Sequence, residues 1–180
     1  MSSVDDPYDT WNPPSAGTSG IWDAMRIWID ADACPGAIKE MVVRAANRLK
    51  LPAVFVANKN VHLPVSPYLS TVRVGMGLDV ADSYLAKEAQ AGDLALTADI
   101  PLAAALVAKG VVVIDSRGKL YDEENIGEAL AMRNFMSELR EGGTVTGGPK
   151  AFGAREALEF AATFDRELAR LVKRGGASGE

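Results

Sequence analysis

The chain has very little cysteine and histidine: Cys34 and His62 are the only residues of their kinds among 180. A single cysteine excludes an internal disulfide framework and a cysteine-rich zinc site. A single histidine excludes a His-rich metal site, and His62 lies in a loop among apolar residues, where packing is the simpler role. Cys34 precedes a predicted helix, and we expect a small buried thiol because no histidine is near it in the sequence.

Long apolar runs are also missing. No stretch approaches the ~20 residues of a membrane helix, and the N-terminus shows no basic segment followed by an apolar one, as a signal peptide would. We therefore expect a cytoplasmic protein without membrane contact. The net charge of −5 is partly carried by the first 22 residues, so the remainder permits a nucleic-acid or phosphate partner without demanding one.

The composition divides the chain into three parts. Residues 1–22 are rich in Pro, Ser, Gly and Asp, which predicts a disordered leader. Residues 23–173 contain the regular patterns of one domain, including two helices at its C-terminal end, and residues 174–180 are expected to form a flexible tail.

Apolar strand patterns alternate with single helical patterns along the domain. Strands are predicted at 26–30, 53–57, 71–74, 93–98 and 111–114. Helices are predicted at 35–49, 80–90, 100–109, 125–140 and 154–172. This alternation indicates an α/β fold with a right-handed, mainly parallel five-stranded sheet.

Acidic residues follow three of these strands. They are Asp30, Asp32, Asp79, Asp82 and Asp99. Ligands of open parallel sheets bind beyond the carboxyl ends of the strands, so we expect these acids to lie together. Two carboxylates about 5 Å apart repel by roughly 3 kcal/mol at an effective dielectric of ~20. Oxygen-preferring Mg²⁺ or Mn²⁺ is the natural counter-charge.

Helix capping is the alternative for each acid taken singly. Asp79 or Asp99 could be an N-cap, Asp82 could complete a capping box, and Asp32 could favour a helix dipole. Capping explains less well why three strand-to-helix turns all use Asp, since Ser, Thr and Asn cap comparably.

Several neutral and basic residues are candidates for binding a substrate. Asn58 and Thr97 lie near the same predicted edge and could orient a water or a phosphate, although a structural role is the simpler interpretation. Arg133 and Arg140 share one face of a predicted helix, and Lys150 lies in a Gly-rich loop. These three could hold phosphates along a nucleic-acid strand, or they could simply be solvated charges.

Long segments of the chain resemble the YaiI/YqxD family of uncharacterised bacterial proteins. The similarity is carried by IWIDADACP, GLDVADSYLAKEAQAGDLALTADIPLAAALVAKG, LAMRNFMSELR and GGPKAFG. That family is grouped with the PIN-like superfamily, so the resemblance implies a PIN-like three-layer α/β/α sandwich. Many members of the superfamily are Mg²⁺- or Mn²⁺-dependent ribonucleases. On this resemblance Asp30, Asp99 and either Asp79 or Asp82 match the acids of the superfamily.

These observations lead to one hypothesis and two alternatives. The hypothesis is a metal-dependent nuclease acting on single-stranded RNA or another nucleic acid, with all five aspartates in the catalytic site and Asp30, Asp82 and Asp99 as metal ligands. The first alternative is a phosphatase of the haloacid-dehalogenase kind, with Asp30 as nucleophile and Asp32 as general acid. The second is a non-catalytic domain that binds RNA or protein. The oligomeric state stays open, and a homodimer is compatible with the sequence.

Overall fold

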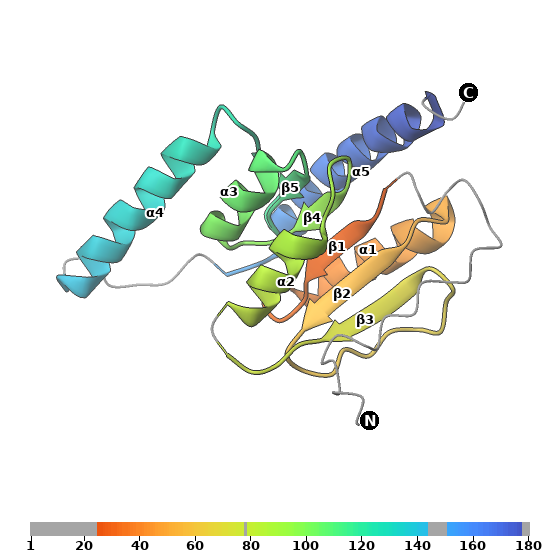
Figure 1. Ribbon diagram of the computed structural model, residues 1–180, viewed down its shortest axis with the longest axis horizontal. Coiled ribbons are helices and arrows are strands. Elements are labelled where there is room, and N and C mark those ends of the chain that lie inside the picture. Colours follow the sequence, from red (N-terminus) through yellow and green to blue (C-terminus); the bar gives the residue numbers. More distant parts are fainter. Residues whose placement is uncertain (1–24, 78, 144–150, 178–180) are drawn as a thin grey trace, which may run out of the picture.

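The computed structural model describes residues 25–77, 79–143 and 151–177 (Figure 1). The predicted leader at 1–22, the candidate Lys150 and the last three residues of the predicted tail lie outside these ranges. The strands are β1 (Ile27–Asp30), β2 (Ala53–Ala57), β3 (Leu69–Arg73), β4 (Leu94–Leu96), β5 (Val112–Ile114) and β6 (Leu120–Tyr121). The helices are α1 (Gly36–Leu49), α2 (Val80–Glu88), α3 (Ile100–Ala108), α4 (Ile126–Glu141) and α5 (Ala154–Ala177).

The strands form one sheet in the order β3-β2-β1-β4-β5-β6. The first five strands run parallel and β6 runs antiparallel to β5, so the predicted α/β fold with a mainly parallel sheet is confirmed. The sequence did not predict β6, because two residues are too few to display an alternating pattern. The strand forms because the Asp115 carboxylate accepts the backbone N–H groups of Arg117 and Lys119, each at 2.9 Å, and so reverses the chain.

Helices α1 and α5 cover one face of the sheet. The inward residues of α1 follow helical spacing, and α5 contributes a stripe of buried side chains: Phe160, Phe164, Leu168 and Leu171. The two phenylalanine rings stack with their centroids 5.1 Å apart. Burying one such ring contributes about 1.5–3 kcal/mol, so this stripe is a major part of the core.

Helices α2 and α3 cover the opposite face, which completes the three layers that the resemblance implies. Trp28 of β1 is buried there and meets Tyr84 of α2 edge to face, with ring centroids 6.3 Å apart. Helix α4 packs against α3 but has no buried residue, and Figure 1 shows it extending away from the body of the domain. No helix in the described part of the chain is long and apolar enough to cross a membrane.

The C-terminal helix is longer than the sequence predicts. We expected it to end near residue 172 and to give way to a flexible tail at 174–180, but α5 continues to Ala177. A long helix extends at low cost once it is nucleated, and a glycine opposes this by only about 1 kcal/mol.

The order of the strands creates a switch point at β1 and β4. After β1 the chain builds β2 and β3 on one side, and it then returns to place β4 on the other side of β1. Helices α1 and α3 leave the carboxyl ends of β1 and β4, so they diverge at this point. In open α/β sheets a ligand binds in the crevice at such a switch point.

Candidate active site

Asp30 and Thr97 lie on either side of the switch point. Asp30 is the last residue of β1, and Thr97 directly follows the neighbouring strand β4. The buried Thr97 hydroxyl donates a hydrogen bond to Asp30 Oδ2 at 3.1 Å and accepts the backbone N–H of Asp99 at 3.1 Å. Thr97 therefore links two of the predicted site acids and fixes the position of the Asp30 carboxylate.

Asp99 caps helix α3 and also faces another acid. Its Oδ1 atom accepts the backbone N–H of Leu102 at 2.8 Å, so the capping interpretation is confirmed for this residue. Its carboxyl group also lies within hydrogen-bonding reach of the Asp82 carboxyl. Capping and membership of the acidic group are therefore compatible at this position.

Asp79 and Asp82 lie at the start of α2. Asp79 is exposed and adopts the left-handed conformation, with φ of 66°, and its side chain makes no capping hydrogen bond. Asp79 therefore occupies the N-cap position, but its side chain does not cap the helix, and its backbone lies in a region that few residues other than glycine, asparagine and aspartate adopt. Asp82 is partly buried in the first turn of the helix.

Burial and the charges of neighbouring acids shift the pKa values of Asp82 and Asp30. Burial raises the pKa of Asp82 to about 6, with further upward contributions from the charges of Asp99, Asp30 and Asp79. Burial also raises the pKa of Asp30; the Thr97 hydrogen bond opposes that shift, while the charges of Asp32 and Asp99 add to it. The five predicted site acids therefore form one electrostatically coupled group, which we call the acidic group.

Asp32 links the ends of two neighbouring strands. Its side chain is exposed, and Oδ2 accepts the backbone N–H of Asn58 at 2.8 Å. Asn58 directly follows β2, so this bond ties the end of β1 to the end of β2. Asn58 thus lies at the predicted edge, where its backbone contacts the acidic group.

The acidic group lacks cationic partners in the described part of the protein. None of the ion pairs found among residues 25–77, 79–143 and 151–177 involves any of its five members. The N-termini of α1, α2 and α3 follow these strands and supply partial positive charge. Formal negative charge therefore exceeds positive charge at this edge, which favours a bound cation.

A small cavity adjoins Asp30. It measures about 10 Å³, roughly the space of one water-sized sphere, and its lining includes Asp30, Cys34, Thr97 and Ser116. Cys34 is only partly buried, and burial raises the pKa of its thiol to about 12, which disfavours a reactive thiolate. The cavity therefore offers room for a single small guest beside a carboxylate.

The carboxylates of the acidic group are not arranged as a complete set of metal ligands. Within the described ranges, no three His, Cys, Asp or Glu side chains are grouped closely enough to hold a metal ion. The donor types suit Mg²⁺ or Mn²⁺, since all are carboxylates with a neighbouring hydroxyl. Binding through three carboxylates would therefore need at least one of them to change rotamer.

Comparison with known sequences identifies the family. The sequence profile of the uncharacterised YaiI/YqxD family matches residues 28–170. The chain belongs to the YaiI/YqxD family. Proteins called UPF0178 from Myxococcus xanthus and Syntrophobacter fumaroxidans are each 57% identical to it, over 83% and 84% of this chain and 97% and 99% of their own lengths. A UPF0178 protein from Geobacter metallireducens is 54% identical over 83% of the chain and 96% of its own length. No solved structure matches.

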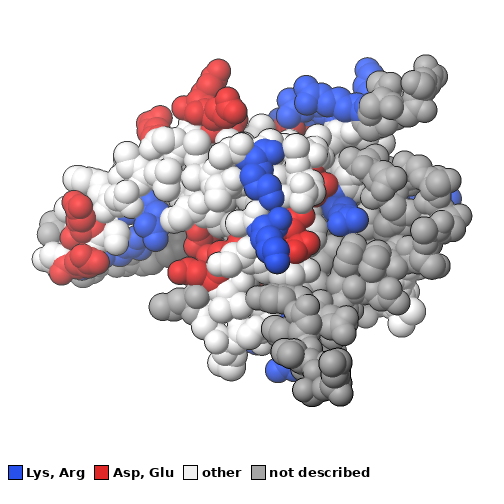
Figure 2. Space-filling view, viewed as in Figure 1, with Lys and Arg blue, Asp and Glu red and all other residues white. Residues whose placement is uncertain are grey.

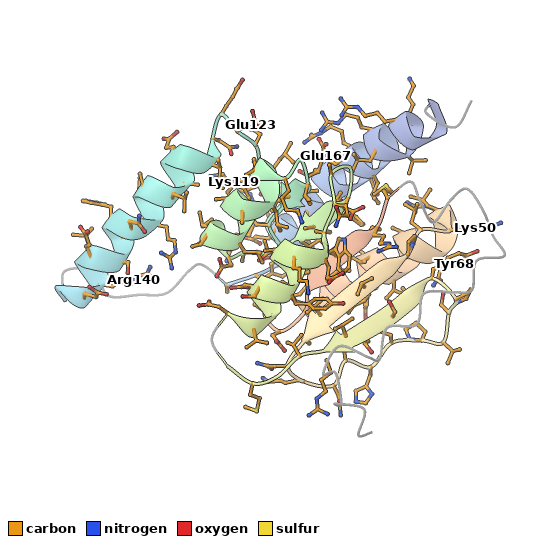
Figure 3. All side chains as sticks on the ribbon, in the orientation of Figure 1. Lys50, Tyr68, Lys119, Glu123, Arg140 and Glu167 are labelled. Carbon is orange, nitrogen blue, oxygen red and sulfur yellow. The ribbon has the colours of Figure 1, made fainter. Side chains whose placement is uncertain are left out.

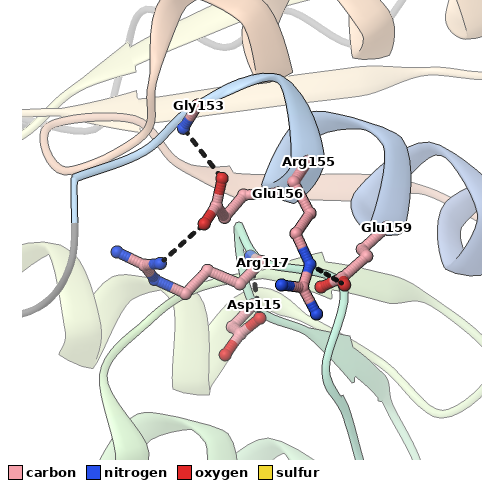
Figure 4. Close-up of polar contacts among 6 residues, drawn as sticks. All are labelled: Asp115, Arg117, Gly153, Arg155, Glu156 and Glu159. Atoms are coloured by element: carbon pink, nitrogen blue, oxygen red, sulfur yellow. Dashed lines mark hydrogen bonds and ion pairs between the residues drawn. The ribbon is translucent and has the colours of Figure 1, made fainter.

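The turn after β5 places Ser116, a residue that the sequence analysis did not name, in the lining of the cavity beside Asp30. The neighbouring Arg117 lies 3.7 Å from Glu156 of α5 (Figure 4). Glu156 also accepts the backbone N–H of Gly153 at 3.0 Å. At Gly118, with φ of +86°, an added Cβ would lie 2.5 Å from the Glu159 carbonyl oxygen, so only glycine fits this close approach. The Asp-x-x-Gly sequence at Asp115 predicts a turn directly after the strand, and the structure confirms it.

The two predicted substrate-binding arginines, Arg133 and Arg140, lie away from the acidic group. Arg133 and Arg140 are exposed on α4, and Figure 3 shows Arg140 at the end of that helix, away from the sheet. The guanidinium of Arg133 donates a hydrogen bond to its neighbour Asn134 at 3.3 Å. Lys150 lies outside the described residues. Of the predicted binding residues that the structure describes, Asn58 and Thr97 lie with the acids and the two arginines do not.

Proposed function

We propose that this YaiI/YqxD protein is a Mg²⁺- or Mn²⁺-dependent phosphodiesterase of the PIN-like type that hydrolyses single-stranded RNA or a related nucleic acid. One observation carries the proposal. Asp30, Asp82 and Asp99 come from separate elements near the switch point of the sheet, and burial together with the charges of Asp99 and Asp30 raises the pKa of Asp82 to about 6. Such a group gains most from a divalent cation, which nucleases of the resembled superfamily use.

Asp30, Asp82 and Asp99 would hold the ion. When bound, it would lower the pKa of a water and neutralise charge on the phosphate oxygens. Thr97 holds the Asp30 carboxylate by its hydroxyl, and the same hydroxyl accepts the Asp99 N–H, so the two ligands keep a fixed separation. The Leu102 N–H holds the Asp99 carboxylate and the Thr97 hydroxyl holds that of Asp30, so Asp82 is the ligand that we expect to change rotamer.

The other members of the acidic group would act from the periphery. Asp32 is anchored to the Asn58 N–H, which leaves its second oxygen to accept a hydrogen bond from water. Asp79 is exposed at the start of α2, with its backbone in the left-handed region, and its charge contributes to the raised pKa of Asp82. Neither role requires a covalent intermediate with the protein.

A cleavage assay tests the proposal. Labelled single-stranded RNA is incubated with the protein and Mn²⁺, and with the Asp30→Asn and Asp99→Asn variants. Asp165→Asn is the matched control, because Asp165 lies in an exposed ion pair with Arg48 on the outer surface. We expect cleavage by the wild-type and control proteins, at least about 100-fold slower cleavage by both site variants, and no cleavage in EDTA.

Other outcomes would contradict the assignment in distinct ways. Cleavage that persists in EDTA or in Asp30→Asn would exclude the proposed ligands. An aspartyl-phosphate trapped on Asp30 would indicate the haloacid-dehalogenase alternative instead. RNA binding without cleavage at any Mn²⁺ concentration would indicate a non-catalytic binding domain.

A further inference from the structure

A second pocket is lined by residues of β2, of β3 and of the segment that joins these two strands. Its polar lining consists of Lys59, Asn60, His62, Thr71 and Arg73, and we call it the basic pocket. The remaining lining residues are apolar, and no carboxylate is among them. Figure 1 shows β3 at the edge of the sheet with the segment between β2 and β3 running beside it. The pocket is therefore formed by that segment folding back along β3.

We propose that the basic pocket binds a phosphate of the nucleic-acid strand next to the phosphate that is hydrolysed at the acidic group. The inference rests on the proposed function, since it names a second contact for the same substrate. Lys59 and Arg73 of the basic pocket would then have the phosphate-binding role that the sequence suggested for Arg133 and Arg140.

The register of the strands brings the pocket and the acidic group together. Arg73 lies opposite Ala57, the last residue of β2. The next residue, Asn58, is held by the Asp32 carboxylate at 2.8 Å, and Lys59 follows at once. A strand bound across Asp32 and Asn58 would therefore pass directly from the acidic group to Lys59.

The chemistry of the lining suits a phosphate. The guanidinium of Arg73 donates one hydrogen bond to Asn60 Oδ1 at 3.2 Å, which orients it and uses only one of its five N–H donors. No ion pair among the described residues involves Lys59 or Arg73. Lys and Arg, together with Asn and Thr, are the side chains that most often bind backbone phosphates.

The size of the pocket favours part of a larger molecule. Its volume is about 250 Å³, below the ~300–1,000 Å³ typical of pockets that enclose a whole small ligand. On the face drawn in Figure 2, the described basic side chains form separate small groups divided by white and red surface.

Binding of a fluorescent single-stranded RNA in EDTA, where no metal-dependent cleavage occurs, tests the proposal. The variant carries Lys59→Gln and Arg73→Gln, and its control carries Lys87→Gln and Lys173→Gln. Lys87 lies in the last turn of α2 and Lys173 is exposed near the end of α5, so the control has the same net charge. We expect the pocket variant to bind about tenfold more weakly, with a salt slope smaller by about 0.7 for each cation removed.

Several results would overturn the inference. One is a pocket variant that binds as the control does, and another is a wild-type protein that does not bind the RNA in EDTA. Equal competition by a phosphopeptide would reassign the pocket to a protein ligand. Because Arg73 is hydrogen-bonded to Asn60, a melting curve of each variant checks that the fold is intact. Lys59→Gln alone changes an exposed side chain, and it must also weaken RNA binding, by less than the double variant does.

A second measurement separates this inference from the proposed function. With Mn²⁺, the pocket variant should show a raised KM for a long RNA and an unchanged rate for a dinucleotide, which is too short to reach the pocket. If the wild-type protein cleaves neither substrate, the proposed function fails, and the binding experiment in EDTA still decides whether the pocket binds RNA.

Discussion

Two aspartates at opposite edges of the sheet have opposite surroundings. Asp93, just before β4, is buried, and its carboxylate accepts N–H groups from the Arg26 backbone, the Trp28 indole and the Gln90 backbone, each at 2.9 Å. Asp82, at the other edge, faces acidic neighbours, and its pKa rises to about 6. A structural carboxylate is surrounded by donors, whereas the acidic group concentrates charge that the described protein does not neutralise.

Asp93→Asn should have the largest effect on stability. Asparagine places an NH₂ group where the carboxylate accepts N–H groups, so at least one buried donor loses its partner. We expect the free energy of unfolding to fall by about 3 kcal/mol. Urea denaturation measures it, and a loss below about 1 kcal/mol would mean that these hydrogen bonds do not distinguish the two edges.

Mn²⁺ should stabilise the protein through the acidic group. An ion at 100 times its dissociation constant adds about 2.7 kcal/mol to the free energy of unfolding. The pKa of Asp82 is about 6, so protons compete with the ion below that pH, and the stabilisation should be larger at pH 7.5 than at pH 5. Calorimetric melting curves at both pH values measure this, and equal shifts would place the ion elsewhere.

Asp82→Asn should stabilise the metal-free protein. Because the folded-state pKa of Asp82 is raised from 3.8 to about 6, the folded state binds the proton more tightly, and stability falls as the pH rises between these values. Removing the charge should add about 1 kcal/mol at pH 7.5, less than the full shift implies, because solvent screens this partly exposed group. The gain should vanish below pH 4, and a gain that persists there would have another cause.

The smallest change in the free energy of unfolding is expected for Asp99→Asn in the absence of metal. Asparagine caps a helix about as well as aspartate, so Asp99→Asn should change the free energy of unfolding by less than about 0.5 kcal/mol, while Asp99→Ala should cost about 1 kcal/mol. Denaturation in EDTA compares the two. A large loss in Asp99→Asn would show that the charge itself stabilises the fold.

The fold was predictable where burial imposes a clear pattern. The apolar run Ala53–Ala57 is buried along its whole length, and both of its predicted ends agree with the structure. β3 begins at Leu69, two residues before its predicted start. The first residues of this strand are partly exposed, so their sequence does not show the apolar pattern of a buried strand. β6 and its pairing with β5 depend on the turn at Asp115. A strand of two residues shows no apolar pattern from which this pairing could be predicted.

The candidate site was predictable where topology alone determines it. Parallel strands end at one edge, so the gathering of Asp30, Asp82 and Asp99 followed from their places in the sequence. The hydrogen-bond partners of the side chains could not be predicted in the same way. The sequence allowed a capping side chain at both Asp79 and Asp99, and in the structure only the Asp99 side chain caps its helix. The basic pocket was missed because it needs the β2–β3 register, which brings distant residues together.

The most direct test of the acidic group as a metal site is the anomalous diffraction of Mn²⁺ in crystals of the wild-type protein soaked at saturating concentration. The account predicts a peak at the switch point, in contact with carboxylate oxygens of Asp30, Asp82 and Asp99, and its loss in crystals of Asp30→Asn. A saturated crystal with no peak at that edge, or with Mn²⁺ bound only elsewhere, would contradict it.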